Sequence, residues 1–257
     1  MKVFDLHCDT LSELRYAEKA GTPKSFAQND LHIDLQKLKK GDYMLQCFAA
    51  FVNLGDKTPG ADPLVTALEE IDVFKRIMEK YPEDIAPVYQ PSDIRRNAAE
   101  GKISGMLTIE EGGCCKGSLG VLRRMYELGV RMMTLTWNFK NGLAEPNIVP
   151  GTDDMWPRPA NTTGGLTEKG LEFVEEMQRL QELQAANFAI TELGLYLDTH
   201  ADDAEAVQLF NEYVEQYELL RQQMADGGFA LTQTEAAMCG RYTWLDDPWP
   251  WDAETEA

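Results

Sequence analysis

A histidine and an aspartate two positions apart follow a short apolar run near the start of the chain. His7 and Asp9 come directly after residues 3–6, a run that is typical of a buried strand. Residues two apart in a strand point to the same face, so an imidazole and a carboxylate here could reach one cation. Zinc accepts nitrogen and oxygen ligands of this kind. The alternative reading of the pair is a surface histidine beside an acid.

A second candidate ligand, Glu110, stands at the end of another apolar run. Residues 103–109 predict a strand, and Gly112 and Gly113 follow soon after the glutamate. Glycines let the backbone turn sharply and approach a ligand closely. A carboxylate that bridges two metal ions would make this a hydrolytic two-metal site. A helix N-cap or a loop acid is the alternative interpretation.

Strand and helix patterns alternate along the first two-thirds of the chain. Such alternation predicts an α/β protein with a parallel sheet, in which sites form at the carboxyl ends of strands. Ser92 is a plausible N-cap of one helix. The expected strands are residues 3–6, 43–52, 103–109 and 130–136, and the expected helices are residues 11–20, 63–80, 92–100, 119–128 and 167–183.

Five motifs in this region stand in a fixed order. They are DLHCDT at residues 5–10, LTIEEGG at 107–113, LGVLRRMYELGVR at 119–131, TLTWN at 134–138, and GLT with EMQRL at 165–180. Together they resemble the membrane (renal) dipeptidase family, peptidase family M19, in its bacterial form. The resemblance covers residues 1 to about 183. It implies a (β/α)8 (TIM) barrel-like fold, a site with two zinc ions, hydrolysis of dipeptides and, commonly, a homodimer.

The resemblance also implies roles for particular residues. His7 and Asp9 match the family's first-strand metal ligands, and Glu110 matches its bridging carboxylate. Trp137 and Asn138 follow the fourth strand, where mammalian members carry a histidine that polarises the substrate. We therefore expect Trp137 and Asn138 to bind substrate.

The family's fifth and sixth strands supply two further histidine ligands, and here the chain departs from the pattern. Its three histidines are His7, His32 and His200. His32 matches no ligand and is expected to be structural or exposed. His200 ends a strand-like segment at residues 193–200 that loosely echoes the family's fifth strand, so it is the candidate for a fourth ligand. The barrel is therefore expected to be incomplete or modified in its C-terminal half, with an exposed sheet face and one zinc ion or none.

Residues 184–257 differ in character from residues 1–183. They hold 15 acidic and two basic residues, so they carry −13 of the net charge of −19. An amphipathic helix is expected at residues 201–225, ending at Gly227, followed by a tail rich in tryptophan and proline at residues 240–257. That tail could fold back as a lid or dock on a partner. The expected domains are thus a dipeptidase-like part, residues 1–183, and a divergent acidic segment, residues 184–257.

The charge and the apolar pattern also exclude some classes of partner. A net charge of −19 disfavours binding to nucleic acid or anionic membranes. Neither a signal-peptide core nor an apolar run of about 18 residues is present, so a cytoplasmic protein is expected. The five cysteines match no disulfide or zinc-knuckle spacing and are interpreted as free thiols.

Three functions are compatible with these patterns. The first is zinc-dependent hydrolysis of dipeptides. The second is a catalytically inactive dipeptidase-like chain that binds a partner or dimerises through residues 201–225. The third is a single-metal hydrolase of another amide or ester, related to the family only through His7 and Asp9.

Overall fold

The computed structural model describes residues 2–55, 61–149, 159–162 and 164–226. The chain divides into two compact units, Met1–Phe173 and Val174–Ala257. The expected end of the last helix at Gly227 and the expected tail at residues 240–257 lie outside the described residues. The predicted domain boundary at residue 183 stays a prediction.

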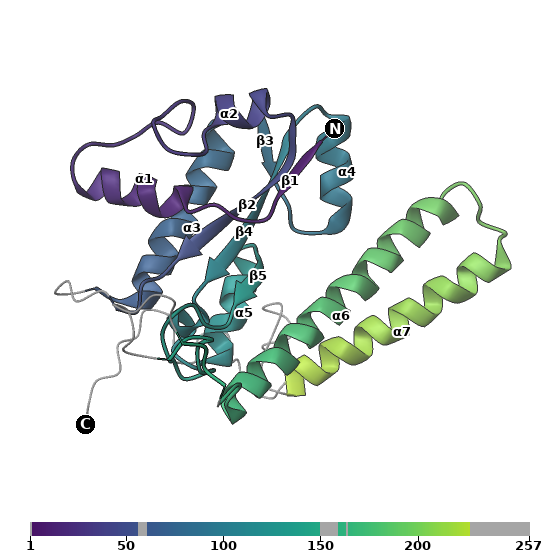
Figure 1. The fold of residues 1–257 in the computed structure, drawn as a ribbon. Coiled ribbons are helices and arrows are strands. Elements are labelled where there is room, and N and C mark those ends of the chain that lie inside the picture. The colour runs from purple at the N-terminus through teal and green to yellow at the C-terminus, as the bar shows by residue number, and fades with distance from the viewer. Residues whose placement is uncertain (1, 56–60, 150–158, 163, 227–257) are drawn as a thin grey trace, which may run out of the picture. The chain divides into compact units, whose positions relative to one another are not determined.

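The first unit is built around a sheet whose described strands all pair in parallel (Figure 1). The strands are β1 (Val3–Asp5), β2 (Tyr43–Phe51), β3 (Ile85–Pro87), β4 (Ile103–Glu110) and β5 (Val130–Thr134). Their order is β1-β2-β4, with the short β3 beside the start of β4 and β5 beside its end. The predicted α/β class with a parallel sheet is confirmed. The sequence patterns missed β3, whose three residues are too few to show a period.

Helices connect these strands (Figure 1). They are α1 (Thr10–Lys19), α2 (Leu35–Lys40), α3 (Pro63–Lys80), α4 (Pro91–Ala99) and α5 (Leu119–Glu127), with a 3-10 turn at Gly112–Cys115. The bounds of α3 agree with the prediction because its start is strongly signalled. Asp62 accepts hydrogen bonds from the backbone N–H groups of Leu64 and Val65, and Pro63 occupies the first helical position.

The predicted N-cap of α4 is wrong. The helix begins at Pro91, one residue before Ser92, and Gln90 is its N-cap. The fixed φ of proline suits the first turn of a helix, and Asp93 then accepts a hydrogen bond of 3.0 Å from the backbone N–H of Gln90.

The core of the first unit lies around β2. Phe48 is fully buried, and its ring centroid lies 5.9 Å from that of Phe26 and 5.8 Å from that of Phe74 on α3. By contrast, Phe4 and Met132, on β1 and β5, are 53% and 41% exposed. Within the described residues β1 pairs with β2 alone and β5 with β4 alone. Within the described residues the sheet therefore has open edges and exposed apolar residues, and the expected incomplete barrel stays a prediction.

The second unit contains most of a helical hairpin formed by α6 (Glu168–Leu197) and α7 (Ala204–Asp226) (Figure 1). The prediction of a strand-like segment at residues 193–200 is wrong, because α6 continues through Leu197. Earlier in α6, the residues Leu180, Leu183 and Ala186 are buried at the three-residue spacing of a helix. A short apolar run such as the one that follows does not by itself distinguish a helix from a strand. In the described part of the chain, no helix is both long and apolar enough to span a bilayer.

Candidate metal centre

Three side chains from two separate parts of the first unit meet at the carboxyl ends of its strands. His7 and Asp9 follow β1, and Glu110 is the last residue of β4. The Nε2 atom of His7 lies 3.2 Å from Oδ1 of Asp9 and 3.3 Å from Oε2 of Glu110. One ligand atom from each residue lies within 4.8 Å of the other two. The structure thus brings together the three residues that the sequence singled out.

The local backbone that aligns His7 with Asp9 differs from the prediction. The strand ends at Asp5, whose carboxylate accepts a hydrogen bond of 3.2 Å from the backbone N–H of His7. The carbonyl of Cys8 accepts a bond of 3.0 Å from the backbone N–H of Ala49 on β2. Asp9 then stands at the N-cap position of α1, but its side chain makes no capping bond. The turn into α1, rather than the alternation of a strand, therefore points both side chains to one place.

The three groups differ in their exposure to solvent. The side chains of His7 and Asp9 are 50% and 54% exposed, whereas that of Glu110 is 17% exposed. Burial raises the pKa of Glu110, and the nearby carboxylates of Asp9 and Glu111 raise it further, while His7 lowers it. A bound cation would offset this crowding of negative charge. One imidazole and two carboxylates form a donor set that suits zinc, so the residues present fit one such ion.

Glu111 has a structural role that the sequence did not reveal. It is fully buried, with a φ of 86°, in the left-handed region that favours glycine. Its carboxyl group accepts hydrogen bonds from the backbone N–H groups of Gly113, at 3.0 Å, and Trp137, at 2.9 Å, and from the side-chain amide of Asn141. Glu111 therefore joins the loop after β4 to the loop after β5.

Trp137 and Asn138 lie in the loop after β5. Trp137 is 38% exposed, and its ring centroid lies 5.0 Å from that of Phe51 and 5.8 Å from that of Phe139. Phe51 is paired in register with Glu110, so this aromatic cluster adjoins the strand end that carries the glutamate. Asn138 is half-buried. Their roles in binding substrate stay predictions.

The other two histidines have different surroundings. His32 is exposed, in agreement with the prediction. His200 belongs to the second unit and lies in the turn after α6. Its ring stacks on that of Tyr196 with centroids 4.2 Å apart, and its Nδ1 atom lies 2.9 Å from the hydroxyl of Thr199. Its role as a fourth ligand stays a prediction.

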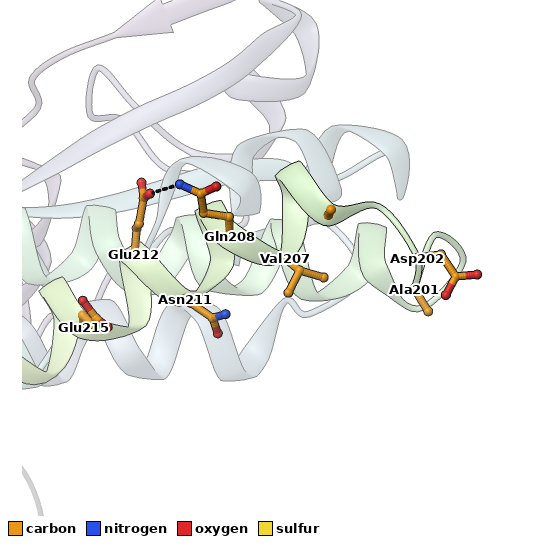
Figure 2. A pocket seen from close by; sticks show the side chains of 8 residues that line it. Ala201, Asp202, Val207, Gln208, Asn211, Glu212 and Glu215 are labelled. Atoms are coloured by element: carbon orange, nitrogen blue, oxygen red, sulfur yellow. Dashed lines mark hydrogen bonds between the residues drawn. The ribbon is translucent and has the colours of Figure 1, made fainter.

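A shallow hollow of about 510 Å³ runs along the first half of α7 (Figure 2). Figure 2 shows that the side chain of Gln208 donates a hydrogen bond of 2.9 Å to Glu212 beside this hollow. The lining contains carboxylates but no histidine, so it does not repeat the donor set of the first unit. The lining residues are Ala201, Asp202, Ala204, Val207, Gln208, Asn211, Glu212 and Glu215.

The parallel sheet, with an imidazole and two carboxylates gathered at the ends of its strands, defines an α/β protein with a candidate metal centre. Residues 1–183 match the family model of membrane dipeptidase, peptidase family M19, and the chain belongs to this family. A second family model, described as CotJB protein, matches residues 177–252. The two matches meet within α6.

Solved structures of dipeptidases share the fold of this chain. Dipeptidase AC, a metallo peptidase of family M19, and a metallo peptidase from Rhodobacter sphaeroides, liganded with a phosphinate mimic of L-Ala-D-Ala, each match with a TM-score of 0.56 and 22% identity over 70% of this chain. The probable dipeptidase PvdM from Pseudomonas aeruginosa matches with a TM-score of 0.51 and 19% identity over 68% of this chain and 44% of its own. The chain covers only 54% and 56% of the first two structures.

Proposed function

We propose that this dipeptidase-like protein hydrolyses dipeptides with zinc held by His7, Asp9 and Glu110. The observation that carries the proposal is the convergence of these three side chains within 4.8 Å, in a member of the membrane dipeptidase family. The relative liganded with a dipeptide mimic supports a dipeptide as the substrate. Because the chain spans about half the length of these structures, activity is a proposal rather than a property taken from them.

Each residue of the centre has a separate role in the proposed reaction. His7 offers a ring nitrogen, and Asp9 and Glu110 offer carboxylate oxygens. When bound, zinc would polarise the substrate carbonyl and lower the pKa of water to about 7. The exposed side of the centre, at His7 and Asp9, admits the substrate from solvent. The half-exposed ring of Trp137 offers an apolar surface for a substrate side chain.

The three residues suffice for one ion, and a second ion requires other ligands, of which His200 is the candidate. A homodimer and a cytoplasmic location are further expectations from the sequence that we retain as proposals. A single-metal hydrolase of another amide or ester needs only the ligands of one ion.

The second candidate function is that of an inactive dipeptidase-like chain that binds a partner. The observation that favours it is the match of residues 177–252 to CotJB protein, a different family from the one matched by residues 1–183. The hairpin also exposes Leu195 and Leu219, at 63% and 59%, which could contact another protein.

Metal stoichiometry measured together with turnover separates these functions. We expect the purified full chain to bind at least one zinc ion tightly and to cleave L-Ala-D-Ala. The substitution His7→Ala should lower both zinc affinity and turnover by more than about 100-fold, since even the loss of a residue that only supports a ligand costs 10–100-fold. The exposed His32 provides the matched control, and His32→Ala should leave both unchanged.

Three results would decide between these functions. Less than one tightly bound zinc and no cleavage would favour the inactive chain. Turnover that survives His7→Ala would remove the centre from the reaction. Turnover that survives His200→Ala but not His7→Ala would show that His200 is dispensable and that one ion suffices.

A further inference from the structure

A buried carboxyl group lies behind the candidate centre, on the helix that follows β2. Glu70, in the middle of α3, has no exposed surface. Its Oε2 atom accepts a hydrogen bond of 2.9 Å from the hydroxyl of Ser12 and one of 2.8 Å from the backbone N–H of Phe51. Its Oε1 atom has no hydrogen-bond partner and lies 3.9 Å from the Nη1 atom of Arg15.

A carboxyl group in this position is costly to bury. Burial raises the pKa of Glu70 to about 8, and the charge of Asp9 adds to the rise, whereas Ser12, Arg15 and the N–H of Phe51 oppose it. The neighbouring core positions of α3, Ile71 and Phe74 among them, are apolar. An apolar residue at position 70 would avoid the cost of desolvation. The presence of a buried glutamate there therefore requires an explanation, and its two hydrogen bonds suggest one.

One donor to Glu70 lies in the segment that carries His7 and Asp9, and the other lies at the end of the strand that pairs with the strand of Glu110. Ser12 lies in the first turn of α1, three residues after Asp9. Phe51 is the last residue of β2 and is paired in register with Glu110, and the backbone N–H of Val52 donates a bond of 3.1 Å to the carbonyl of Glu110. One oxygen atom of Glu70 therefore ties the start of α1 to the strand end beside Glu110.

We propose that Glu70 is a positioning residue, which holds the segment of His7 and Asp9 and the strand end of Glu110 at the separation where all three can share one cation. The identity of that cation rests on the proposed function above. The positioning itself does not, because both hydrogen bonds exist without any ion.

Substitutions at position 70 separate positioning from packing. Glu70→Gln keeps a carbonyl oxygen that can accept both hydrogen bonds, whereas Glu70→Leu removes the acceptor and leaves the N–H of Phe51 without its partner. Ile71→Ala, at a neighbouring buried position, destabilises α3 without touching either bond. Glu79→Leu removes an exposed glutamate from the same helix and is the control for charge.

Zinc affinity is measured by calorimetry on the full chain, at a temperature where circular dichroism shows that each variant is folded. We expect Glu70→Leu to weaken zinc binding by about 10–100-fold, the effect of losing a residue that orients a ligand. Glu70→Gln, Ile71→Ala and Glu79→Leu should stay near the parent affinity. Parent-like affinity in Glu70→Leu, or an equal loss in Ile71→Ala, would overturn the proposal.

Hydrogen exchange of the metal-free protein distinguishes the failure of this inference from the failure of the proposed function. Glu70→Leu should speed exchange at the amide of Phe51 and in residues 8–13, and Glu70→Gln should restore the parent rates. If the parent chain binds no zinc, the proposed function fails, and these exchange rates alone decide the positioning role. Unchanged exchange in Glu70→Leu would contradict it.

Discussion

The two units of the chain differ in how far apart in sequence their hydrogen-bonded side chains lie. In the first unit, Ser12 bonds to Glu70, 58 positions away, and Glu111 bonds to the backbone of Trp137, 26 positions away. In the second unit, Tyr196 bonds to Asp203, seven positions away. Others there, Gln208 with Glu212 and Arg221 with Glu218, follow the spacing of a helix surface.

This difference explains where chemistry can arise. A helical hairpin can arrange neighbouring residues on one face, but it does so with bonds that each contribute little at an exposed surface. A sheet whose strands come from distant parts of the chain can bring His7 and Glu110, 103 positions apart in the sequence, to within 3.3 Å. The first unit therefore brings His7, Asp9 and Glu110 together, and the most acidic part of the chain lies in the second unit.

The largest effect is expected from a substitution that creates a cavity in the core of the first unit. Phe48→Ala should lower the free energy of unfolding by about 3–5 kcal/mol, because a fully buried ring with two aromatic neighbours is lost. Hydrogen exchange of the full chain can assign the loss to β2 and β4. If the amides of α7 lose as much protection, the two units unfold together, and the comparison fails.

A smaller effect is expected at Glu111, which accepts hydrogen bonds from both loops beside the candidate centre. Glu111→Ala should destabilise the first unit by about 2–3 kcal/mol, because it leaves the N–H groups of Gly113 and Trp137 and the side-chain amide of Asn141 without this acceptor. Urea unfolding followed by circular dichroism measures the change. The matched control is Glu205→Ala on α7, an exposed acid of the second unit, which should change stability by less than about 0.5 kcal/mol. Equal losses in the two variants would show that the long-range bonds of Glu111 add no more stability than an exposed acid does.

The smallest expected effect, when taken per pH unit, is a dependence of stability on pH. The pKa of Glu70 is raised to about 8 in the folded chain, so the folded state retains a proton that the unfolded state has lost above its ordinary pKa, near 4.5. The stability due to this group is therefore present at low pH and falls as the pH rises toward 8, with a slope of at most about 1.4 kcal/mol per pH unit.

Urea unfolding of the metal-free protein between pH 5.5 and 8 measures this slope. Arg15 and Asp9 are the charged groups that also act on Glu70, and neither is altered in Glu70→Gln. The difference in slope between the parent and Glu70→Gln therefore reports this carboxyl group. Identical slopes would show that Glu70 does not carry the proton.

Local signals in the sequence predicted much of the first unit. The predicted bounds of α3 agree with the structure, and strongly apolar runs identified β2 and β4. Ordered motifs identified the family over residues 1–183. The strand pattern failed at residues 193–197, because a short apolar run suits either a strand or a buried helical turn, and only its neighbours decide between them.

The sequence by itself determined the types and the chain order of the candidate ligands His7, Asp9 and Glu110, because ligand chemistry belongs to single side chains and their spacing is local. Only the tertiary structure decided that these three meet, that Glu111 accepts bonds from two loops, and that Glu70 ties α1 to β2. Such contacts depend on which strands pair and which helix covers them. A buried glutamate in the middle of a helix has the same local pattern as an exposed one, and only the surrounding fold makes it a tether.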